Sequence, residues 1–530
     1  MNPSIVAIAL TGFAALLVLM LMPKEDKPFA VAVCVTWVFV AAIAFLLADA
    51  SLTFIALFML LAAAGAASPR GGVFLYIAVM PALPAGLLYD VPMPGLNYLI
   101  TLDYPKLAAL VLLGPAFIKA SFTRAPAHFR GIEHLLLFFV LFTGLMAFRD
   151  LPFTSVLRTI FDLFVLVYLP FIAISRTLIT QKDIDWALRA FFASFLMLAV
   201  IGVISTLRSW NYYASIGEGS FGKAYFDVRN GLLRVSATMI PSLLAALTSA
   251  GLILALVLRA RKEISPLFAY ISIGILGFTC FATGARGGWL AAIACVAAYF
   301  VFYYGGAALR RLAYAAAIIC VLVGFSLIFS DSDVLNDEYG TVNYRAELIR
   351  TSVAQIQERP LFGASDIFNL PRFQHLRQGE GIIDLVNAYI QIVLFYGLVG
   401  LGTLLGAHAL GAMGGLRELN ELPRPRDLTP AQAEQRRTVA FLLAMQGGYL
   451  VLIATISFVA QVPHYGYLIL AALVAQARIL KTQRLAAAEP DKTIAETEAI
   501  APPPPEAPPS SPSPAPSGPV PYGARFVRRQ

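Results

Sequence analysis

The chain has 530 residues, of which 59% are hydrophobic and only 13% are charged. A soluble domain carries roughly 25% charged residues, so this composition excludes an ordinary soluble enzyme. The net charge of +8 does not indicate nucleic-acid binding, because the basic residues gather in short loops between apolar runs. Apolar runs of roughly 17 to 25 residues recur along the chain, and we therefore expect an all-α, polytopic membrane bundle of about 12–15 transmembrane helices.

The first apolar run follows Met1 without a basic segment or a small-residue cleavage site, so we expect a retained helix and not a signal peptide. The four cysteines lie inside apolar runs and have no disulfide or metal-site spacing. The predicted spans are 4–22, 29–48, 52–67, 72–89, 104–119, 131–147, 157–175, 187–206, 236–258, 265–283, 287–304, 312–329, 386–408, 438–457 and 464–478.

Basic residues occupy alternate loops, and this sets the expected orientation. Arg70, Arg189 and Arg261 lie in such loops, and the 409–437 loop carries four more arginines between 424 and 437. The positive-inside rule places these loops in the cytoplasm of a bacterial inner membrane. The periplasmic face then holds loops 90–103, 148–156, 207–235, 283–287 and 330–385.

We divide the chain into an N-terminal transmembrane bundle (1–230), a second transmembrane region (231–480) and a tail (481–530). The tail includes a Pro-rich segment that cannot bury a core, so we expect it to be disordered and cytoplasmic.

The long loop 330–385 belongs to the second transmembrane region and contains a predicted helix at 342–359, which Pro360 ends. Ile349, Val353 and Ile356 form the expected apolar stripe of this helix.

Two arginines at the expected external surface are the main candidates for chemistry. Arg234 lies in GLLRVSATMIPSLLAAL, and Arg286 lies in ATGARGGWLAA. An arginine near the hydrocarbon edge is costly, and its guanidinium can bind phosphate oxygens bidentately at any relevant pH. These residues suit the diphosphate of a lipid-linked substrate. The alternative is that each arginine snorkels to lipid phosphate or pairs with an acid.

Four segments together resemble the O-antigen ligase and polymerase family. In chain order they are RVSATMIPSLLAALT (234–248), TGARGGWL (283–290), YRAELIRTSVAQIQERPLFGAS (344–365) and DLVNAYIQIVLFYGLVGLG (384–402). The resemblance implies transfer of a glycan from a polyprenyl-diphosphate donor to an acceptor hydroxyl at the periplasmic face. It also implies that Arg234 and Arg286 bind the diphosphate and stabilise the leaving group.

The resemblance further implies supporting roles for Arg345 in the loop and for Asn387 and Tyr389 at the helix entry. One departure concerns the proton acceptor, because ligases of the family carry His-Asn where this chain has Val386-Asn387. Asp384, two residues earlier, is the first candidate for this role.

His375 is the second candidate for the proton acceptor, and His464 is also expected on the external side. The alternative for Asp384 is that it only caps the following helix. Arg158 and Asp162 are expected to form an i,i+4 ion pair.

We expect a polymerase that joins undecaprenyl-diphosphate-linked repeat units into O-antigen or exopolysaccharide. It needs no cofactor, nucleotide sugar or metal, because the donor is already activated. A flippase, a chain-length regulator and membrane lipids are the expected partners. The alternatives are an O-antigen ligase or O-oligosaccharyltransferase, and a membrane transporter or flippase, which would be expected to show inverted repeats and ionisable groups near mid-bilayer.

Overall fold

The computed structural model describes the chain outside a set of gaps. The gaps are residues 1–2, 22–26, 48–49, 84–87, 95–96, 123–129, 212–227, 230, 307, 313–340, 379–380, 460 and 501–530. The predicted span 312–329, the first part of loop 330–385 and the Pro-rich segment therefore lie outside the described residues. The chain divides into two units, Met1–Lys481 and Thr482–Gln530.

The chain is an all-α polytopic bundle, as predicted. Within the described residues, six helices are long and apolar enough to cross a membrane, and further apolar helices are shorter. The helices are α1 (Pro3–Leu21), α2 (Lys27–Leu46), α3 (Ala50–Ala67), α4 (Pro69–Val79), α5 (Tyr104–Ala108), α6 (Gly114–Ser121), α7 (Arg130–Ala147), α8 (Phe153–Leu163), α9 (Leu169–Thr177), α10 (Gln181–Arg208), α11 (Pro241–Ala260), α12 (Pro266–Ala282), α13 (Arg286–Tyr304), α15 (Thr341–Glu358), α16 (Ala388–Glu421), α17 (Pro430–Ile453) and α18 (Val462–Ile500).

Prolines explain where several helices are interrupted. A short π-helix, Ala109–Leu113, joins α5 to α6 just before Pro115. A second π-helix, Phe164–Tyr168, joins α8 to α9 just before Pro170. A proline removes one helical hydrogen bond, and a wider turn accommodates its ring. The second pair forms one helix long enough to cross a membrane, Phe153–Thr177, and the first pair runs on without a gap from Tyr104 to Ser121.

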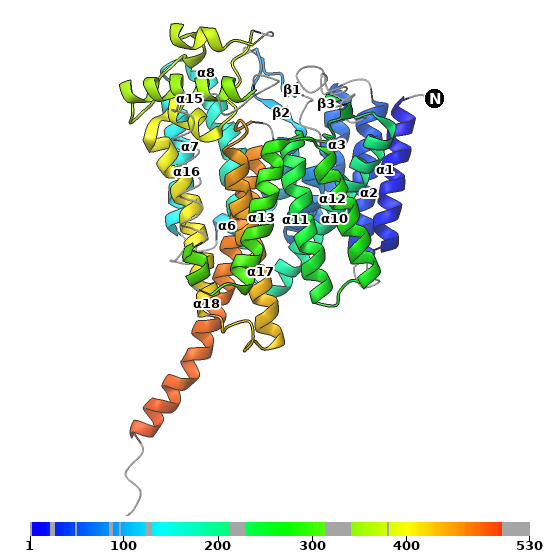
Figure 1. The fold of residues 1–530 in the computed structure, drawn as a ribbon, viewed down its shortest axis with the longest axis vertical. Coiled ribbons are helices and arrows are strands. Elements are labelled where there is room, and N and C mark those ends of the chain that lie inside the picture. Colours follow the sequence, from blue (N-terminus) through cyan, green and yellow to red (C-terminus); the bar gives the residue numbers. More distant parts are fainter. Residues whose placement is uncertain are drawn as a thin grey trace, which may run out of the picture. The chain divides into compact units, whose positions relative to one another are not determined.

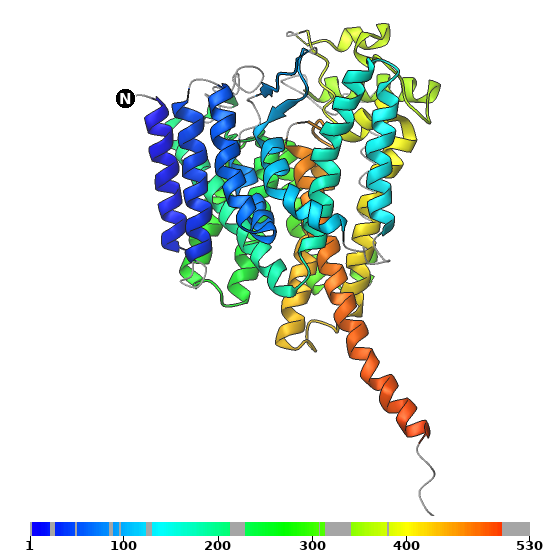
Figure 2. The same cartoon turned by 180° about the vertical axis from the view of Figure 1, so that it is seen from behind.

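The helices run between two ends of the bundle (Figures 1 and 2). Two short antiparallel hairpins, β1 (Leu88–Asp90) with β2 (Thr101–Asp103) and β3 (Val228–Arg229) with β4 (Leu232–Leu233), lie at the same end as α15, which we call the loop end. We call the opposite end, where α16 ends and α17 begins, the basic end. Within the bundle α13 packs along α17, α11 packs against both α12 and α13, and α7 packs against α16.

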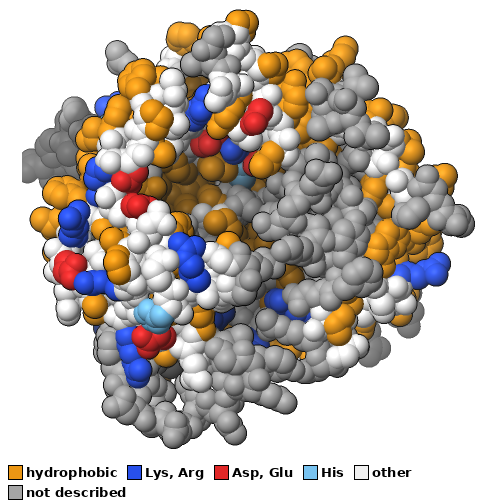
Figure 3. All heavy atoms as spheres, turned by 90° about the horizontal axis from the view of Figure 1, so that it is seen from above, with side chains coloured by type: hydrophobic (Ala, Val, Ile, Leu, Met, Phe, Trp, Pro, Cys, Tyr) orange, Lys and Arg blue, Asp and Glu red, His pale blue; other side chains and the backbone are white. Residues whose placement is uncertain are grey.

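At the loop end, α15 and two short 3-10 helices, η8 (Ile367–Asn369) and η9 (Pro371–Leu376), form a small core with the start of α16 (Figure 3 views this end). The helix predicted at 342–359 is confirmed as α15, but its buried face lies one residue before the predicted apolar stripe. α15 buries Leu348, Ser352 and Gln355, whereas Ile349 and Val353 are only half-buried. The inward face therefore carries polar as well as apolar side chains.

The segment Pro360–Gly363 docks into a break in α16. At Gly397 the helix adopts φ 66° and ψ −169°, and the N–H groups of the next two residues donate to the carbonyl oxygens of Pro360 (2.8 Å) and Leu361 (3.2 Å). A Cβ on Gly397 would lie 2.1 Å from the Leu361 oxygen, so both the positive φ and the close approach require glycine. The segment Pro360–Gly363 (PLFG) and the part of α16 around Gly397 (FYGLVG) are thus hydrogen-bonded to each other, and we call this contact the joint.

Arg149, in the turn between α7 and α8, clamps this joint. Its Nη1 donates to the carbonyl oxygens of Phe362 (2.9 Å) and Gly363 (3.2 Å), and its Nη2 donates to that of Phe395 (2.6 Å). A single guanidinium therefore ties α7, the loop and α16 together.

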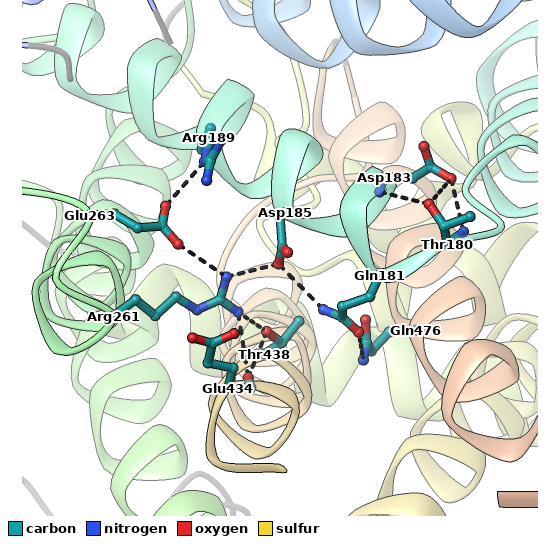
Figure 4. Close-up of polar contacts among 10 residues, drawn as sticks. All are labelled: Thr180, Gln181, Asp183, Asp185, Arg189, Arg261, Glu263, Glu434, Thr438 and Gln476. Carbon is teal, nitrogen blue, oxygen red and sulfur yellow. Dashed lines mark hydrogen bonds and ion pairs between the residues drawn. The ribbon is translucent and has the colours of Figure 1, made fainter. Parts of the chain in front are cut away.

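At the basic end an ion-pair network joins α10, the α11–α12 turn and α17 (Figure 4). Arg261 Nη1 lies 2.8 Å from Asp185 and 3.5 Å from Glu263, and Glu263 also pairs with Arg189 at 3.1 Å. The basic residues of these loops are partly neutralised by acids from neighbouring elements.

Candidate functional site

Two arginines meet at the turn between α12 and α13. Gly284 has φ +56°, and a Cβ there would lie 3.3 Å from Cγ of Arg234, so the aliphatic stem of Arg234 packs against this glycine. Arg234 Nε donates to the carbonyl oxygen of Thr283 at 3.4 Å. Arg286 follows two residues later as the first residue of α13. The structure thus brings together the two residues predicted to bind a diphosphate.

Arg286 occupies a position where a cation is normally unfavourable. The N-terminus of a helix carries a partial positive charge and unpaired N–H groups, and it favours anions. The Arg286 side chain is exposed, the α13 N-cap residue Ala285 supplies no side-chain bond, and no described residue forms an ion pair with Arg286. The guanidinium and the helix N-terminus would both be stabilised by the same anion.

A buried asparagine fixes the backbone around Arg234. The Asn211 side chain donates to the Arg234 carbonyl oxygen (2.8 Å) and accepts from the Ser236 N–H (3.3 Å). The Val235 N–H donates to the Ala282 carbonyl oxygen at 3.2 Å, which joins this segment to the end of α12. The position of Arg234 is therefore set by Asn211, three residues after the end of α10, and by the end of α12, as well as by its own segment.

The link between α17 and α18, residues 454–461 with 460 outside the described residues, contacts the start of α13, α15 and the start of α16, and we call it the connector. A Cβ on Gly287 would lie 2.3 Å from Thr455 Oγ1, and the Thr455 carbonyl oxygen accepts from Arg345 Nη2 at 3.5 Å. Farther along, the Phe458 N–H donates to Gln391 Oε1 (2.7 Å). The connector therefore supports the arginine turn on one side and α15 with α16 on the other.

Asp384 is held by contacts from two elements. The Ser457 hydroxyl lies 3.0 Å from Asp384 Oδ1 and at the same distance from the Leu385 carbonyl oxygen. The Tyr344 hydroxyl, on α15, lies 3.0 Å from both the backbone N–H and the carbonyl oxygen of Asp384. Burial raises the pKa of Tyr344, so this phenol stays protonated and can donate.

Asn387, and not Asp384, is the residue that caps α16. Its side chain accepts from the N–H groups of Tyr389 (2.9 Å) and Ile390 (3.1 Å). The alternative that Asp384 merely caps this helix is therefore wrong. Tyr389 in turn donates to the Leu450 carbonyl oxygen at 2.7 Å, so the helix-entry residues fix α16 against α17.

The two histidines expected on the external side differ in their surroundings. His375 lies at the surface in η9, where its Nε2 is 3.3 Å from Glu347 and about half of its side chain is exposed. His464 is fully buried at the start of α18, with Nδ1 3.2 Å from the Tyr76 hydroxyl.

The expected ion pair between Arg158 and Asp162 is not formed. Asp162 instead binds Lys106, with Oδ1 2.8 Å from Nζ. Arg158 stacks over the Tyr98 ring at 3.8 Å and donates to the carbonyl oxygens of Tyr98 and Leu99. A partner from a distant part of the chain has replaced the local one.

The sequence interpretation missed Asn211, the connector and the Arg149 clamp. Asn211 lies beside an aromatic-rich loop, and the connector appears only as a short break between two apolar runs. Arg149 is a charged residue in a predicted external loop, and its contacts with the PLFG segment lie more than 200 residues away in sequence. No local pattern could have indicated these contacts.

Residues 271–405 match the protein family described as O-antigen ligase. This segment contains Arg286, Arg345, His375, Asp384 and Asn387, and it begins after Arg234. No curated protein matches the chain. The family has ligase- and polymerase-type enzymes of polysaccharide biosynthesis. The chain is therefore a polytopic α-helical membrane protein whose residues 271–405 match the O-antigen ligase family.

Proposed function

We propose that this protein is a polysaccharide polymerase that joins undecaprenyl-diphosphate-linked repeat units at the periplasmic face of the inner membrane. The observation that carries the proposal is the turn 283–286, which places Arg286 at a helix N-terminus and Arg234 against Gly284. Two guanidiniums and free N–H groups at one turn suit a diphosphate.

In the proposed reaction, an acceptor hydroxyl attacks the anomeric carbon of the donor sugar, and the bond to the lipid diphosphate breaks. Negative charge develops on the departing diphosphate, so fixed cations beside it lower the barrier. Arg286 and Arg234 take this role. The hydroxyl proton leaves to a base on the protein.

For that base we propose Asp384, with His375 as the second candidate. Asp384 is partly buried and held by Ser457 and Tyr344, whereas His375 lies at the outer surface against Glu347. A positioned base works best when its geometry is fixed by neighbouring contacts.

The alternative activity is that of a ligase, and the description of the matched family favours it. The residue before Asn387 weighs against it, because this chain has valine where the resembling ligases have histidine.

The test is to reconstitute the full chain in proteoliposomes with undecaprenyl-diphosphate-linked repeat units, with and without lipid A core. A ladder of lipid-linked polymers without lipid A core supports the polymerase. Glycan found only on lipid A core would establish the ligase, and no transfer to either would reject both.

A further inference from the structure

Three charged side chains meet at the loop end, where β2 runs into α5 and approaches α8. Lys106 Nζ lies 2.8 Å from Asp162 Oδ1 and 3.3 Å from the Thr101 carbonyl oxygen. Asp103 caps α5 by accepting from the Lys106 N–H at 2.7 Å. Asp103 also interacts electrostatically with both Lys106 and Asp162. We call Asp103, Lys106 and Asp162 the charged triad.

The charged triad holds two carboxylates for one ammonium. The Lys106 side chain is 12% exposed and that of Asp162 is 36% exposed, while Asp103 is half-buried. Burial raises the pKa of Asp103 to about 6, the negative charge of Asp162 acts in the same direction, and Lys106 opposes it. Near neutral pH the excess carboxylate is ionised but poorly solvated, so it favours a ligand that donates hydrogen bonds.

Among the described residues, no cation other than Lys106 is in hydrogen-bonding contact with the carboxylates of the charged triad. Tyr76 on α4 is bound to His464 on α18. Arg158 on α8 is engaged by Tyr98, and Asp90 on β1 accepts from the Thr101 hydroxyl at 2.5 Å. Within the described part of the chain, Asp162 accepts through Oδ1 from Lys106 Nζ, and Asp103 accepts from the backbone N–H of Lys106 and from its own N–H. Each carboxylate can therefore accept further donors.

The charged triad lies close to the start of α18, which directly follows the connector. Lys106 interacts electrostatically with His464, and Asp103 interacts with Tyr76, whose hydroxyl lies 3.2 Å from His464 Nδ1. The Thr238 hydroxyl, four residues after Arg234, donates to the Pro81 carbonyl oxygen, and Gln461 of the connector donates to that of Leu83. Figure 3 shows this end hollowed, with acidic, basic and histidine side chains gathered at the edge of a hydrophobic floor. A glycan carried on a lipid diphosphate can extend across such a surface.

We propose that the charged triad is a subsite for a sugar unit of the acceptor glycan. The carboxylates of Asp103 and Asp162 accept hydrogen bonds from sugar hydroxyls. Lys106 holds these two carboxylates in position. The inference rests on the proposed function, because it assumes a hydroxyl-rich acceptor. A sugar offers several neighbouring O–H donors, which match two carboxylates held side by side. A site built on such bonds rejects a sugar that lacks the matching hydroxyl.

The test uses the oligosaccharide repeat unit released from its lipid by mild acid, so that the probe carries no diphosphate. Its binding to the full chain in nanodiscs is measured by saturation-transfer NMR titration. Asp103→Asn and Asp162→Asn should each weaken binding by roughly tenfold or more, since a hydrogen bond to a charged group is lost. Asp90→Asn, on the neighbouring strand β1, is the matched control and should bind like the wild type.

Asp103→Asn should fold, because asparagine and aspartate are equally good N-caps. Wild-type affinity should fall as the pH drops through about 6, where Asp103 takes up a proton, and Asp103→Asn should lack this dependence. In transfer assays the variant should raise the acceptor KM and leave kcat nearly unchanged.

Three results would overturn the subsite: no binding of the oligosaccharide by the wild type, unchanged binding by both triad variants, or an equal loss in Asp90→Asn. A fall in kcat without a change in KM would also overturn it, because it would make Asp103 a base. Arg286→Lys separates this inference from the proposed function. It should abolish transfer and still bind the lipid-free oligosaccharide, whereas normal transfer by Arg286→Lys would reject the diphosphate role alone.

Discussion

The Ser457 hydroxyl lies 3.0 Å from Oδ1 of Asp384, so the connector holds the carboxylate that precedes α16. If Asp384 is the base, Asp384→Asn should reduce polymer formation by roughly 100-fold or more, a typical contribution of a general base. Single lipid-linked repeat units should accumulate, as seen by gel analysis of extracted lipids. Ser457→Ala keeps the carboxylate and should cause a smaller loss.

The histidine variant completes this test. His375→Ala should leave polymer formation nearly normal, because His375 lies at the surface against Glu347. Near-normal polymer from Asp384→Asn together with loss in His375→Ala would assign the base to His375.

Arg286→Lys should lower the rate of transfer by roughly 100- to 1,000-fold while the protein inserts at normal levels. Lysine keeps the charge but loses the planar fork that binds two phosphate oxygens at once. Arg359→Lys is the matched control, because Arg359 is exposed just after α15. Wild-type rates from Arg286→Lys would exclude a role in binding the diphosphate.

The joint in α16 can be tested with two glycines of the same helix. Gly397→Ala should prevent stable folding or lower the melting temperature sharply, because a Cβ would lie 2.1 Å from a backbone oxygen at φ +66°. A Cβ on Gly402 meets nothing within 4 Å, so Gly402→Ala should be neutral or slightly stabilising. Thermal unfolding in detergent distinguishes them, and equal melting temperatures would contradict the joint.

Asp103 should make stability depend on pH. Its pKa is raised from 3.8 in a model peptide to about 6 in the folded chain, so the folded state holds its proton more tightly. Ionised Asp103 therefore costs stability above pH 6, and this cost disappears as the pH falls toward 4. Asp103→Asn should raise the melting temperature at pH 7.5 relative to the wild type, with the difference shrinking by pH 4.5. A difference that grows toward low pH would contradict this assignment.

The orientation of the bundle can be tested by cysteine labelling at two exposed positions. Gln357→Cys, at the end of α15, should react with a membrane-impermeant maleimide in intact cells. Ala431→Cys, at the start of α17, should react only after permeabilisation, because the basic loops are expected in the cytoplasm. The reverse pattern would invert the assignment and place the diphosphate site in the cytoplasm.

Apolar runs were sufficient to predict the helical bundle, because a chain that crosses a membrane must satisfy its backbone within each segment. The apolar runs predicted the helix ends less accurately where a proline interrupts the run. The predicted span 72–89 is interrupted, with α4 ending at Val79 and a 3-10 turn following through Pro81.

Contacts between distant residues could not be predicted from local spacing. Arg158 and Asp162 have the spacing of a helix ion pair, yet Asp162 binds Lys106, which lies 56 residues away in sequence. In the same way, Ser457 and Asp384 are 73 residues apart. Arg234 and Arg286 could be chosen as candidates because an arginine near a hydrocarbon edge is conspicuous, whereas a serine in a short break is not.

The loop between Gly363 and Asp384 is fastened at both ends, by the Gly397 joint with its Arg149 clamp and by the Ser457 and Tyr344 contacts. Residues 365–383 are therefore held between two fixed attachments, and Ile367, Phe373 and Leu376 pack with α15 and α16 in the small core of the loop end. Exposed positions of this segment, which take no part in that core, can therefore change in sequence while both attachments and the helices stay as they are.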